Sequence, residues 1–397
     1  MVKEEKRAPR LRLNGYTDDW EQVKLEEVVE ITMGQSPSSK NYTNNSSDHI
    51  LVQGNADMKN GHVEPRVWTT QITKQAKKGD LILSVRAPVG DIGKTDYDVV
   101  IGRGVAAIKG NEYIFQVLIK MKDSGYWTRF STGSTFESIN SSNIRNAQIM
   151  IPKDDEQTKI AKVLTFLDNT IQLHERKYEK LNLIKKALLQ KLFPKKDEVI
   201  PEVRYKNFSD AWEQRKLGEV VKIQSGFTGD SQLNNGKFKI SRIETISNGV
   251  IDSKKIGFSN TAPNKKYKLK VGDILYSNIN SIEHIGKIAK YIEDIDLYHG
   301  INLLRLSSVN ENSSFLFYEL NTENKRNWAK SHANKAVNQA SINQTELKKQ
   351  RLDIPSIEEQ NLISNFLIQL DSLIILHQRK LEKLKQLKKF LLQNMFI

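Results

Sequence analysis

The chain has 397 residues, which predicts two or three domains at about 150 residues each. It contains no cysteine, which excludes disulfide bonds, iron–sulfur clusters, thiolate zinc sites and cysteine nucleophiles. The formal net charge is +14, and this balance favours a polyanionic partner such as nucleic acid. No apolar run approaches the roughly 20 residues of a bilayer span. The first residues also lack the apolar stretch of a signal peptide, so the sequence predicts a soluble, cytoplasmic protein.

The chain contains an internal repeat. Residues 16–29 return 192 residues later as residues 208–221, and residues 138–193 return 203 residues later as residues 341–396. The stretches between these matching ends agree only at scattered Gly-Asp and Gly-Lys positions. The pattern predicts two units that share a framework and present different surfaces. Drift after duplication, without functional meaning, is the alternative.

The first interior stretch, residues 34–137, consists of short β-rich runs broken by Gly, Asn, Ser and Asp. Residues 80–86 are one such run, and they predict a strand. The second interior stretch, residues 226–340, has the same character, for example at residues 272–277. Each stretch predicts a compact α+β or mostly β module.

A long helix is predicted from Glu156 to Phe193, because this segment contains no Gly or Pro and its apolar residues recur at alternating spacings of four and three. The final segment of the chain repeats this pattern, and one lysine interrupts each seam, Lys185 in the first helix and Lys388 in the second. The seam positions are Leu164, Leu167, Ile171, His174, Tyr178 and Leu181 in the first helix and Leu367, Leu370, Ile374, His377, Leu381 and Leu384 in the second. A bare seam would expose apolar surface, so the two helices, each about 38 residues or roughly 55 Å long, are predicted to pair as an antiparallel coiled coil with pseudo-twofold symmetry.

Basic residues follow both predicted helices, and they form either a partner or DNA surface or an ordinary solvated face. They are Arg176, Lys177, Lys180, Lys185 and Lys186 and their counterparts Arg379, Lys380, Lys383, Lys388 and Lys389. The seam histidines are predicted to be packed residues, because no second metal ligand follows either of them at i+4.

No catalytic motif survives inspection. Gly93-Lys94-Thr95 resembles the end of a phosphate-binding loop, but Pro88 stands where that loop needs its first glycine. The Glu-x-Lys pattern at Glu175 lies on the predicted coiled coil, where charge pairing explains it. The sequence therefore predicts no catalytic residue and no metal ligand.

Paired motifs occur in the same order in both halves of the chain. They are the Trp-Glu-Gln starts at Trp20 and Trp212, the Ile-Pro pairs at Ile151 and Ile354, the Glu-Gln pairs at Glu156 and Glu359, the Leu-Asp pairs at Leu167 and Leu370, and the Arg-Lys-x-Glu-Lys-Leu cores at Arg176 and Arg379. In the duplicated order of these motifs the chain resembles, over essentially its whole length, the DNA-specificity (S) subunit of type I restriction–modification systems.

The resemblance implies an α+β protein with two globular target recognition domains, which read the two halves of an asymmetric, bipartite DNA target, separated by the coiled coil as a spacer. It implies double-stranded DNA, two adenine methyltransferase (modification) subunits and restriction subunits as partners in host defence. S-adenosylmethionine, ATP and Mg²⁺ would act in those partners, and this chain would hold no cofactor and perform no catalysis. The expected segments are 1–137 for the first recognition domain, 138–198 for the central helical spacer, 199–340 for the second recognition domain and 341–397 for the distal helical spacer.

Polar and basic side chains in the interior loops are candidates for DNA contacts, because amides, guanidinium groups and hydroxyls bind base edges and phosphates. In the first module they are Gln35, Ser36, Ser38, Lys40, Tyr42, Gln53, Asn55, Arg86, Arg103, Arg129, Thr132 and Ser134. In the second they are Thr228, Arg242, Glu244, Asn278, Asn280, His299, His332, Asn334 and Lys335.

Two other hypotheses remain open from the sequence. The chain could be a self-contained DNA-modifying enzyme with an unrecognised site, or a coiled-coil adaptor whose interior modules bind protein.

Overall fold

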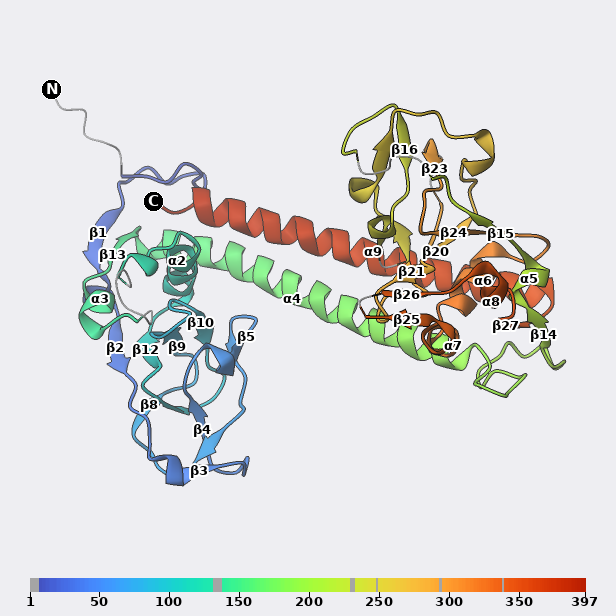
Figure 1. Cartoon of the computed structure of the whole chain (residues 1–397). Helices are drawn as coiled ribbons and strands as arrows, with labels where there is room; N and C mark the ends of the chain where they lie inside the picture. Colours follow the sequence, from blue (N-terminus) through green and yellow to red (C-terminus); the bar gives the residue numbers. More distant parts are fainter. Residues whose placement is uncertain (1–6, 131–137, 229–232, 248, 293–294, 338) are drawn as a thin grey trace. The chain divides into compact units, whose positions relative to one another are not determined.

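A computed structural model describes residues 7–130, 138–228, 233–247, 249–292, 295–337 and 339–397 (Figure 1). The chain divides into two compact units. Unit 1 comprises Met1–Arg176 and His377–Ile397, and unit 2 comprises Lys177–Leu376. Both long helices therefore contribute to both units. This division into compact units does not test the four segments expected from the sequence, and those segments remain a prediction.

Unit 1 combines three sheets with short helices. Its strands are β1 (Glu21–Lys24), β2 (Glu30–Met33), β3 (Tyr42–Thr43), β4 (His49–Val52), β5 (Met58–Lys59), β6 (His62–Val63), β7 (Trp68–Thr69), β8 (Lys74–Ala76), β9 (Leu81–Ser84), β10 (Ile92–Lys94), β11 (Val99–Ile101), β12 (Val105–Lys109) and β13 (Gln148–Ile151). Its helices are α1 (Leu25–Val28), α2 (Glu112–Asp123), α3 (Ser141–Arg145) and the first part of α4 (Asp154–Lys191).

The sheets of unit 1 are small and mixed. The six-stranded sheet has the order β2-β12-β9-β10-β6-β5, a five-stranded sheet has the order β3-β7-β4-β11-β8, and β1 pairs with β13. Strand β9 is buried on both faces, since all four of its side chains are buried. It lies between β12 and β10, in the run of residues 80–86 that predicted a strand.

Unit 2 repeats much of this plan. Its strands are β14 (Glu213–Lys216), β15 (Val221–Ser225), β16 (Phe238–Ile240), β17 (Ile246–Ser247), β18 (Val250–Ile251), β19 (Gly257–Ser259), β20 (Ile274–Tyr276), β21 (Ile279–Asn280), β22 (Ile288–Lys290), β23 (Leu297–Tyr298), β24 (Leu304–Ser308), β25 (Asn334–Ala336), β26 (Gln339–Ser341) and β27 (Arg351–Ile354). Its helices are α5 (Leu217–Val220), α6 (Ser313–Leu320), α7 (Glu323–His332), α8 (Gln344–Leu347) and the first part of α9 (Ile357–Asn394).

The six-stranded sheet of unit 2 has the order β15-β24-β20-β22-β18-β17, which matches that of unit 1 strand for strand, and β14 pairs with β27 as β1 pairs with β13. The smaller sheets differ, because unit 2 has β19-β16-β23 and β21-β26-β25 in place of the five-stranded sheet. The duplication predicted from the sequence thus includes the six-stranded main sheet and the separate strand pair, β1 with β13 and β14 with β27.

The long helices α4 and α9 have 38 residues each and form the antiparallel coiled coil that the heptads predicted. In unit 1, Asp168 of α4 pairs with Lys388 of α9, whereas His174, later in α4, bonds to His377, earlier in α9, with 2.8 Å between the two Nδ1 atoms. In unit 2, Lys185 of α4 pairs with Asp371 of α9. None of the twelve predicted seam residues is exposed.

The two lysines that interrupt the seam have ionic partners on the opposite helix. The Nζ atoms of Lys388 and Lys185 lie 2.5 Å from carboxylate oxygens of Asp168 and Asp371, respectively. Asp168 also accepts a 2.8 Å hydrogen bond from Gln116 of α2, and Asp371 accepts one of 2.8 Å from Tyr318 of α6. Lys185 and Lys388 therefore belong to the helix contact, which corrects their assignment to a basic outer surface.

A second duplicated ion pair fixes the segment that precedes each unit's first strand. Arg12 donates two 2.8 Å hydrogen bonds to Glu156, and Arg204 donates the same two bonds to Glu359. Both glutamates are about 1% exposed and lie in the first turns of α4 and α9. Such bidentate pairs fix orientation as well as distance.

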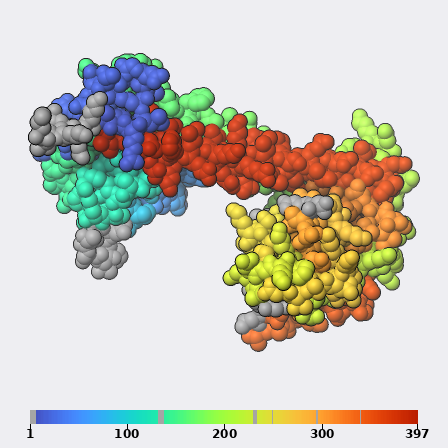
Figure 2. Space-filling view, turned by 90° about the horizontal axis from the view of Figure 1, so that it is seen from above, coloured from blue at the N-terminus to red at the C-terminus, as the bar shows by residue number. Residues whose placement is uncertain are grey.

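Aromatic residues join the end of one long helix to the core of each unit. In unit 1, Phe396 packs against Trp20 and Tyr113, at ring-centroid distances of 6.4 and 5.4 Å. Figure 2 shows the red C-terminal end of the chain against the blue N-terminal segment, where the Leu11 amide donates to the carbonyl of Asn394. The corresponding group in unit 2 is Phe193, Trp212 and Phe315.

Unit 2 also contains a buried ionic cluster. Lys325 Nζ lies 2.8 Å from Asp353 and 3.4 Å from Glu319, and all three side chains are at least nine-tenths buried. Burial raises the pKa of Glu319 to about 8, against the attraction of Lys325. Glu319 therefore keeps its proton to a higher pH than an exposed glutamate does.

Replacing Leu164 with alanine should destabilise the protein by about 2–5 kcal/mol, because this seam side chain is fully buried and its removal leaves a cavity. Phe166→Ala, in the same turn of α4, is the control, since this ring is 74% exposed. Denaturant unfolding should show a change within about 0.5 kcal/mol for the control. Equal losses for both variants would contradict the seam assignment.

The free energy of unfolding should fall as pH rises from about 4.5 to about 8, since the unfolded chain releases the Glu319 proton there while the folded protein keeps it. Glu319→Gln removes this ionisation and should flatten that part of the profile. Urea unfolding at about pH 5 and about pH 8 measures the difference, with exposed Glu323→Gln as control. An unchanged slope in Glu319→Gln would refute the assignment.

Candidate nucleic-acid interface

Three glycines of unit 1 allow separate backbone segments to touch: Gly34 after β2, and Gly102 and Gly104 between β11 and β12. We call this contact the unit 1 glycine crossing. A Cβ atom on Gly34 would lie 2.1 Å from the carbonyl oxygen of Gly102, and one on Gly104 would lie 1.9 Å from that of Gln53. No side chain fits at either position. The crossing is held by backbone hydrogen bonds from Gly34 to Val105 and from Gln35 to Ile101.

The unit 1 glycine crossing brings together five of the candidate DNA-contacting residues. Ser36 Oγ accepts a 3.0 Å hydrogen bond from the backbone N–H of Arg103, and the Gln53 side chain packs beside Gly102. The side chains of Gln35 and Arg103 are exposed. The Val85 N–H donates to the carbonyl of Gly104, which places exposed Arg86 at the same edge. Sequence proximity could not have grouped these residues, because they come from four separate loops.

The other candidates of unit 1 lie apart from this cluster. The Ser38 backbone N–H donates to Gln71, while Lys40 and Tyr42 are exposed in the adjoining 3-10 turn and β3. Asn55 begins the 3-10 turn Asn55–Asp57. The Arg129 guanidinium stacks over the rings of Tyr126 and Phe130, at 3.6 and 4.8 Å. Thr132 and Ser134 lie outside the described residues.

Unit 2 has an equivalent contact, the unit 2 glycine crossing, formed by Gly226 after β15 and Gly300 between β23 and β24. A Cβ atom on Gly226 would lie 1.8 Å from the carbonyl oxygen of Gly300, and one on Gly300 would lie 2.1 Å from that of Ser241. The Phe227 N–H donates to the His299 carbonyl as Gln35 donates to Ile101. Exposed Thr228 follows this crossing directly.

Four candidates of unit 2 are engaged inside the fold. His299 has no exposed surface, its Nε2 lies 2.9 Å from the Leu303 carbonyl oxygen, and burial lowers its pKa to about 4. Arg242 donates to the Leu233 carbonyl, Asn278 to the Ile342 carbonyl, and Asn280 to Ser277 Oγ. His299 is therefore a packed residue and cannot contact a base in this conformation, while the other three have local partners.

The remaining candidates of unit 2 are at the surface. Glu244 lies in the 3-10 turn Ile243–Thr245, His332 stacks on Trp328 at the end of α7, and Asn334 and Lys335 lie in β25. The side chains of all four residues are exposed.

Sequence reasoning missed the basic segment at residues 265–270, which the structure places beside the unit 2 glycine crossing. The Tyr267 ring contacts that of Phe227 at 5.8 Å, and the His299 N–H donates to the Tyr267 carbonyl. Lys266 is exposed over the Tyr267 ring at 5.0 Å. The signal was present in the sequence as four lysines interleaved with Tyr267 and Leu269, a pattern typical of nucleic-acid binding.

The long helices carry a second line of apolar side chains outside the seam, which we call the outer stripe. In unit 1 it includes Phe166 and Phe390, which are 74% and 53% exposed, and in unit 2 it includes Leu376, which is 60% exposed. Its other members are Val163, Leu173, Ile184, Phe366, Leu373 and Leu387. Apart from Lys185 and Lys388, the basic residues of the helices are exposed. Groups of exposed apolar residues are typical of protein interaction sites.

Within the described ranges, no group of three or more His, Cys, Asp or Glu side chains is placed to hold a metal ion. The part of the chain that the structure describes also has no helix with the length and apolarity needed to cross a membrane.

The family model for the type I restriction modification DNA specificity domain matches the chain twice, over residues 17–183 and 209–386. The chain belongs to this family. The two matches correspond to two DNA specificity domains, and the role of the family is recognition of DNA and not catalysis.

Known relatives carry the same description. A putative type I restriction enzyme MjaX specificity subunit of Methanocaldococcus jannaschii is 37% identical over 209 residues, which are 51% of this chain and 49% of the relative. The MjaIX specificity subunit of the same organism is 27% identical over 277 residues, 64% of each chain. The chain thus spans about half of the first relative and about two thirds of the second.

A solved structure shares the fold. The S subunit of a type I restriction–modification system from M. genitalium aligns with a TM-score of 0.67 at 17% sequence identity, covering 98% of this chain and 99% of that chain. This likeness supports the arrangement of two specificity domains with two long helices.

Gly34→Ala should destabilise unit 1 by about 1–3 kcal/mol or more, because the added methyl group collides with backbone that cannot rotate away. Gly54→Ala is the control, since a Cβ atom there meets nothing within 4 Å. Thermal unfolding followed by circular dichroism compares the two. A neutral Gly34→Ala would show that the crossing is not a fixed contact.

Proposed function

We propose that the chain is a non-catalytic, cytoplasmic DNA-binding subunit that reads a bipartite, asymmetric target and scaffolds two adenine methyltransferase subunits of a type I restriction–modification complex. The observation that carries this proposal is the pair of glycine crossings. The same backbone contact displays Gln35 and Arg103 in unit 1 but Thr228 and the lysines of residues 265–270 in unit 2.

Different side chains beside corresponding backbone contacts suit a target whose two halves differ in sequence. Arginine and glutamine at the unit 1 crossing can form bidentate hydrogen bonds with guanine and adenine, respectively, in the major groove. Lysines, such as those beside the unit 2 crossing, bind phosphates and position a protein on DNA without reading bases. The net charge of +14 agrees with contacts to a polyanion in both units.

The outer stripe supports the scaffolding part of the proposal. Val163 and Phe366, Leu173 and Leu376, and Ile184 and Leu387 are pairs separated by 203 residues, so the duplication gives the two helices three exposed apolar positions in common. Two copies of one helical partner could therefore dock in equivalent ways. S-adenosylmethionine, ATP and Mg²⁺ would be used by the modification and restriction subunits. The long helices would set the gap between the two half-sites.

Arg103→Ala should weaken binding of the assembled complex to its target by about 1–3 kcal/mol, and it should relax discrimination in one half-site only. The target is first mapped from methylated adenines in host DNA, and affinities are then measured by fluorescence anisotropy on duplexes altered in one half-site. Lys59→Ala is the charge-matched control in unit 1, on β5, where Lys59 is 3.8 Å from Glu64.

Affinity should also fall steeply between low and physiological salt, because phosphate contacts release counterions. Affinity that stays flat with salt would favour the protein-binding adaptor instead. Methyl transfer by this chain alone would favour the self-contained enzyme.

A further inference from the structure

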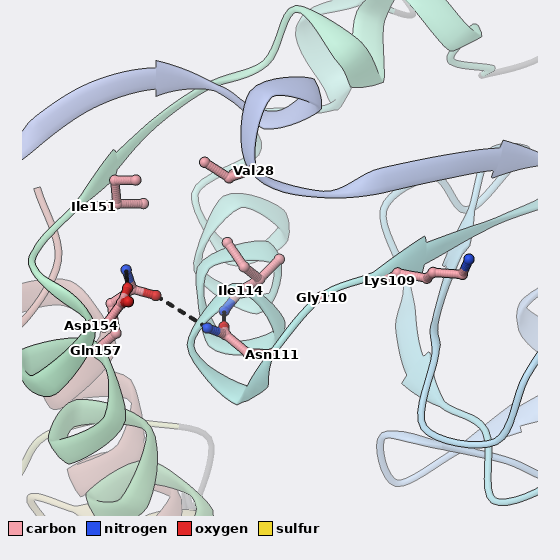
Figure 3. A pocket seen from close by; sticks show the side chains of 8 residues that line it. All are labelled: Val28, Lys109, Gly110, Asn111, Ile114, Ile151, Asp154 and Gln157. Carbon is pink, nitrogen blue, oxygen red and sulfur yellow. Dashed lines mark hydrogen bonds between the residues drawn. The ribbon is translucent and has the colours of Figure 1, made fainter.

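Unit 1 contains an open cavity of about 370 Å³ between the end of the main sheet and the start of α4 (Figure 3). Val28, Ile114 and Ile151 form apolar walls, and Asn111, Asp154 and Gln157 line its polar side. Lys109 also lines it, but the Lys109 ammonium is neutralised by Glu30 at 2.6 Å. The cavity could hold several water molecules or one extended side chain.

The same place in unit 2 can be identified from strand registers. Lys109 of β12 lies opposite Glu30, and its counterpart Ser307 of β24 lies opposite Lys222, which is 192 residues after Glu30. Helix α2 begins three residues after Lys109, whereas α6 begins six residues after Ser307. The connection from strand to helix is therefore three residues longer in unit 2.

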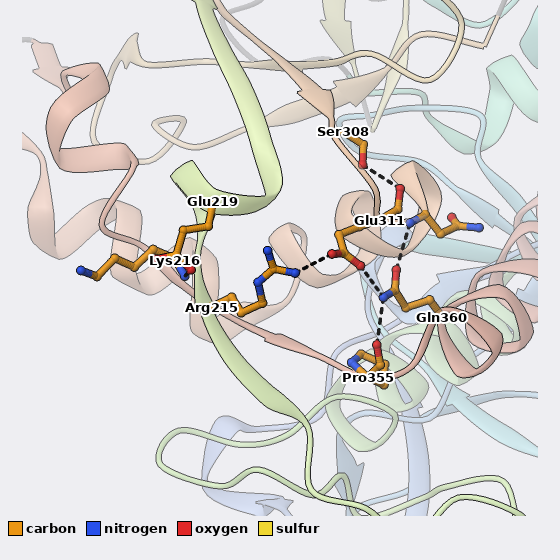
Figure 4. Close-up of polar contacts among 8 residues, drawn as sticks. Arg215, Lys216, Glu219, Ser308, Glu311, Pro355 and Gln360 are labelled. Atoms are coloured by element: carbon orange, nitrogen blue, oxygen red, sulfur yellow. Dashed lines mark hydrogen bonds and ion pairs between the residues drawn. The ribbon is translucent and has the colours of Figure 1, made fainter.

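This longer connection fills the space in unit 2 with Glu311 (Figure 4). Glu311 Oε1 accepts a 2.8 Å hydrogen bond from Arg215, and Glu311 Oε2 accepts one of 2.7 Å from Gln360 Nε2. Ser308 Oγ donates to the Glu311 backbone carbonyl at 2.6 Å. Glu311 and Arg215 side chains are 10% and 29% exposed, so the pair is partly shielded from water.

Unit 1 keeps the glutamine and a carboxylate but lacks the arginine. Gln157 is the counterpart of Gln360 and donates to the Pro152 carbonyl at 2.9 Å, as Gln360 donates to the Pro355 carbonyl. Gln157 Oε1 also accepts a 3.1 Å hydrogen bond from Asn111, and Gln157 Nε2 lies at a longer 3.4 Å from Asp154 Oδ1. Val23 occupies the place of Arg215, because it pairs with Ile149 in β13 as Arg215 pairs with Leu352 in β27.

Asp154 offers a carboxylate at this place without a cation, although its side chain is exposed at the start of α4 whereas that of Glu311 is 10% exposed. Among the residues that the structure describes, no lysine, arginine or histidine forms an ion pair with Asp154. The carboxylate faces a cavity whose apolar walls suit the methylene stem of a long basic side chain. Guanidinium is the cation that occupies the twin site, and its planar fork matches a carboxylate better than an ammonium group does.

We propose that this cavity receives an arginine side chain of a modification subunit, with its guanidinium paired to Asp154 and its stem between Val28 and Ile114. This inference rests on the proposed scaffolding function. It makes the two partner-binding sites unequal, because Arg215 and Glu311 already fill the equivalent place in unit 2. One of the two partner copies would thus be anchored by an interaction that the other lacks.

The test measures the affinity and stoichiometry of modification subunits on the full-length chain by titration calorimetry and native mass spectrometry. Asp154→Asn should weaken one of the two sites about 10–100-fold, the usual range for loss of a charge-assisted hydrogen bond, and leave the other unchanged. Val23→Arg should weaken the same site, because an arginine from β1 would fill the cavity as Arg215 does in unit 2.

Ile357→Asn is the matched control, since Ile357 is the counterpart of Asp154 at the start of α9 and is 46% exposed. It should leave both sites unchanged. Two wild-type sites that Asp154→Asn leaves unaltered would overturn the arginine cavity, whatever the result for Val23→Arg. A wild-type chain that binds no modification subunit would instead overturn the proposed scaffolding function.

Discussion

The pairing of α4 with α9 is the contact on which the rest of each unit depends. A seam of apolar residues supplies most of its stability, but the two lysines within that seam would carry uncompensated charge without Asp168 and Asp371. Each aspartate also bonds to the first helix after the main sheet of its unit. The same carboxylates therefore neutralise the seam lysines and attach α2 and α6, which follow the two main sheets, to the helix pair.

The glycine crossings separate the part of the fold that must stay constant from the part that can vary. At Gly34 and Gly226 the backbone passes so close to another carbonyl that no side chain fits, and the neighbouring amides hydrogen-bond in the same way in both units. The residues that follow are free of this constraint. Gln35 and Phe227 stand at equivalent positions yet have different chemistry, so the two crossings present different surfaces.

Duplication also leaves the two units unequal at a place away from the crossings. A connection three residues longer places Glu311 between Arg215 and Gln360 in unit 2, whereas the shorter connection through Gly110 borders an open cavity in unit 1. Such a difference gives two otherwise similar units distinct surfaces.

The sequence determined the repeat, the two long helices and their seam, because heptad spacing and matching ends are local patterns that need no knowledge of the fold. It also indicated the strands at residues 80–86 and 272–277. It did not determine which loop residues meet, since Ser36 and Arg103 come together only through the backbone contact at Gly102. Nor could it show that His299 is buried, that Lys185 and Lys388 have carboxylate partners, or that residues 265–270 lie beside a crossing. Those facts depend on contacts between segments far apart in the chain, which only tertiary packing decides.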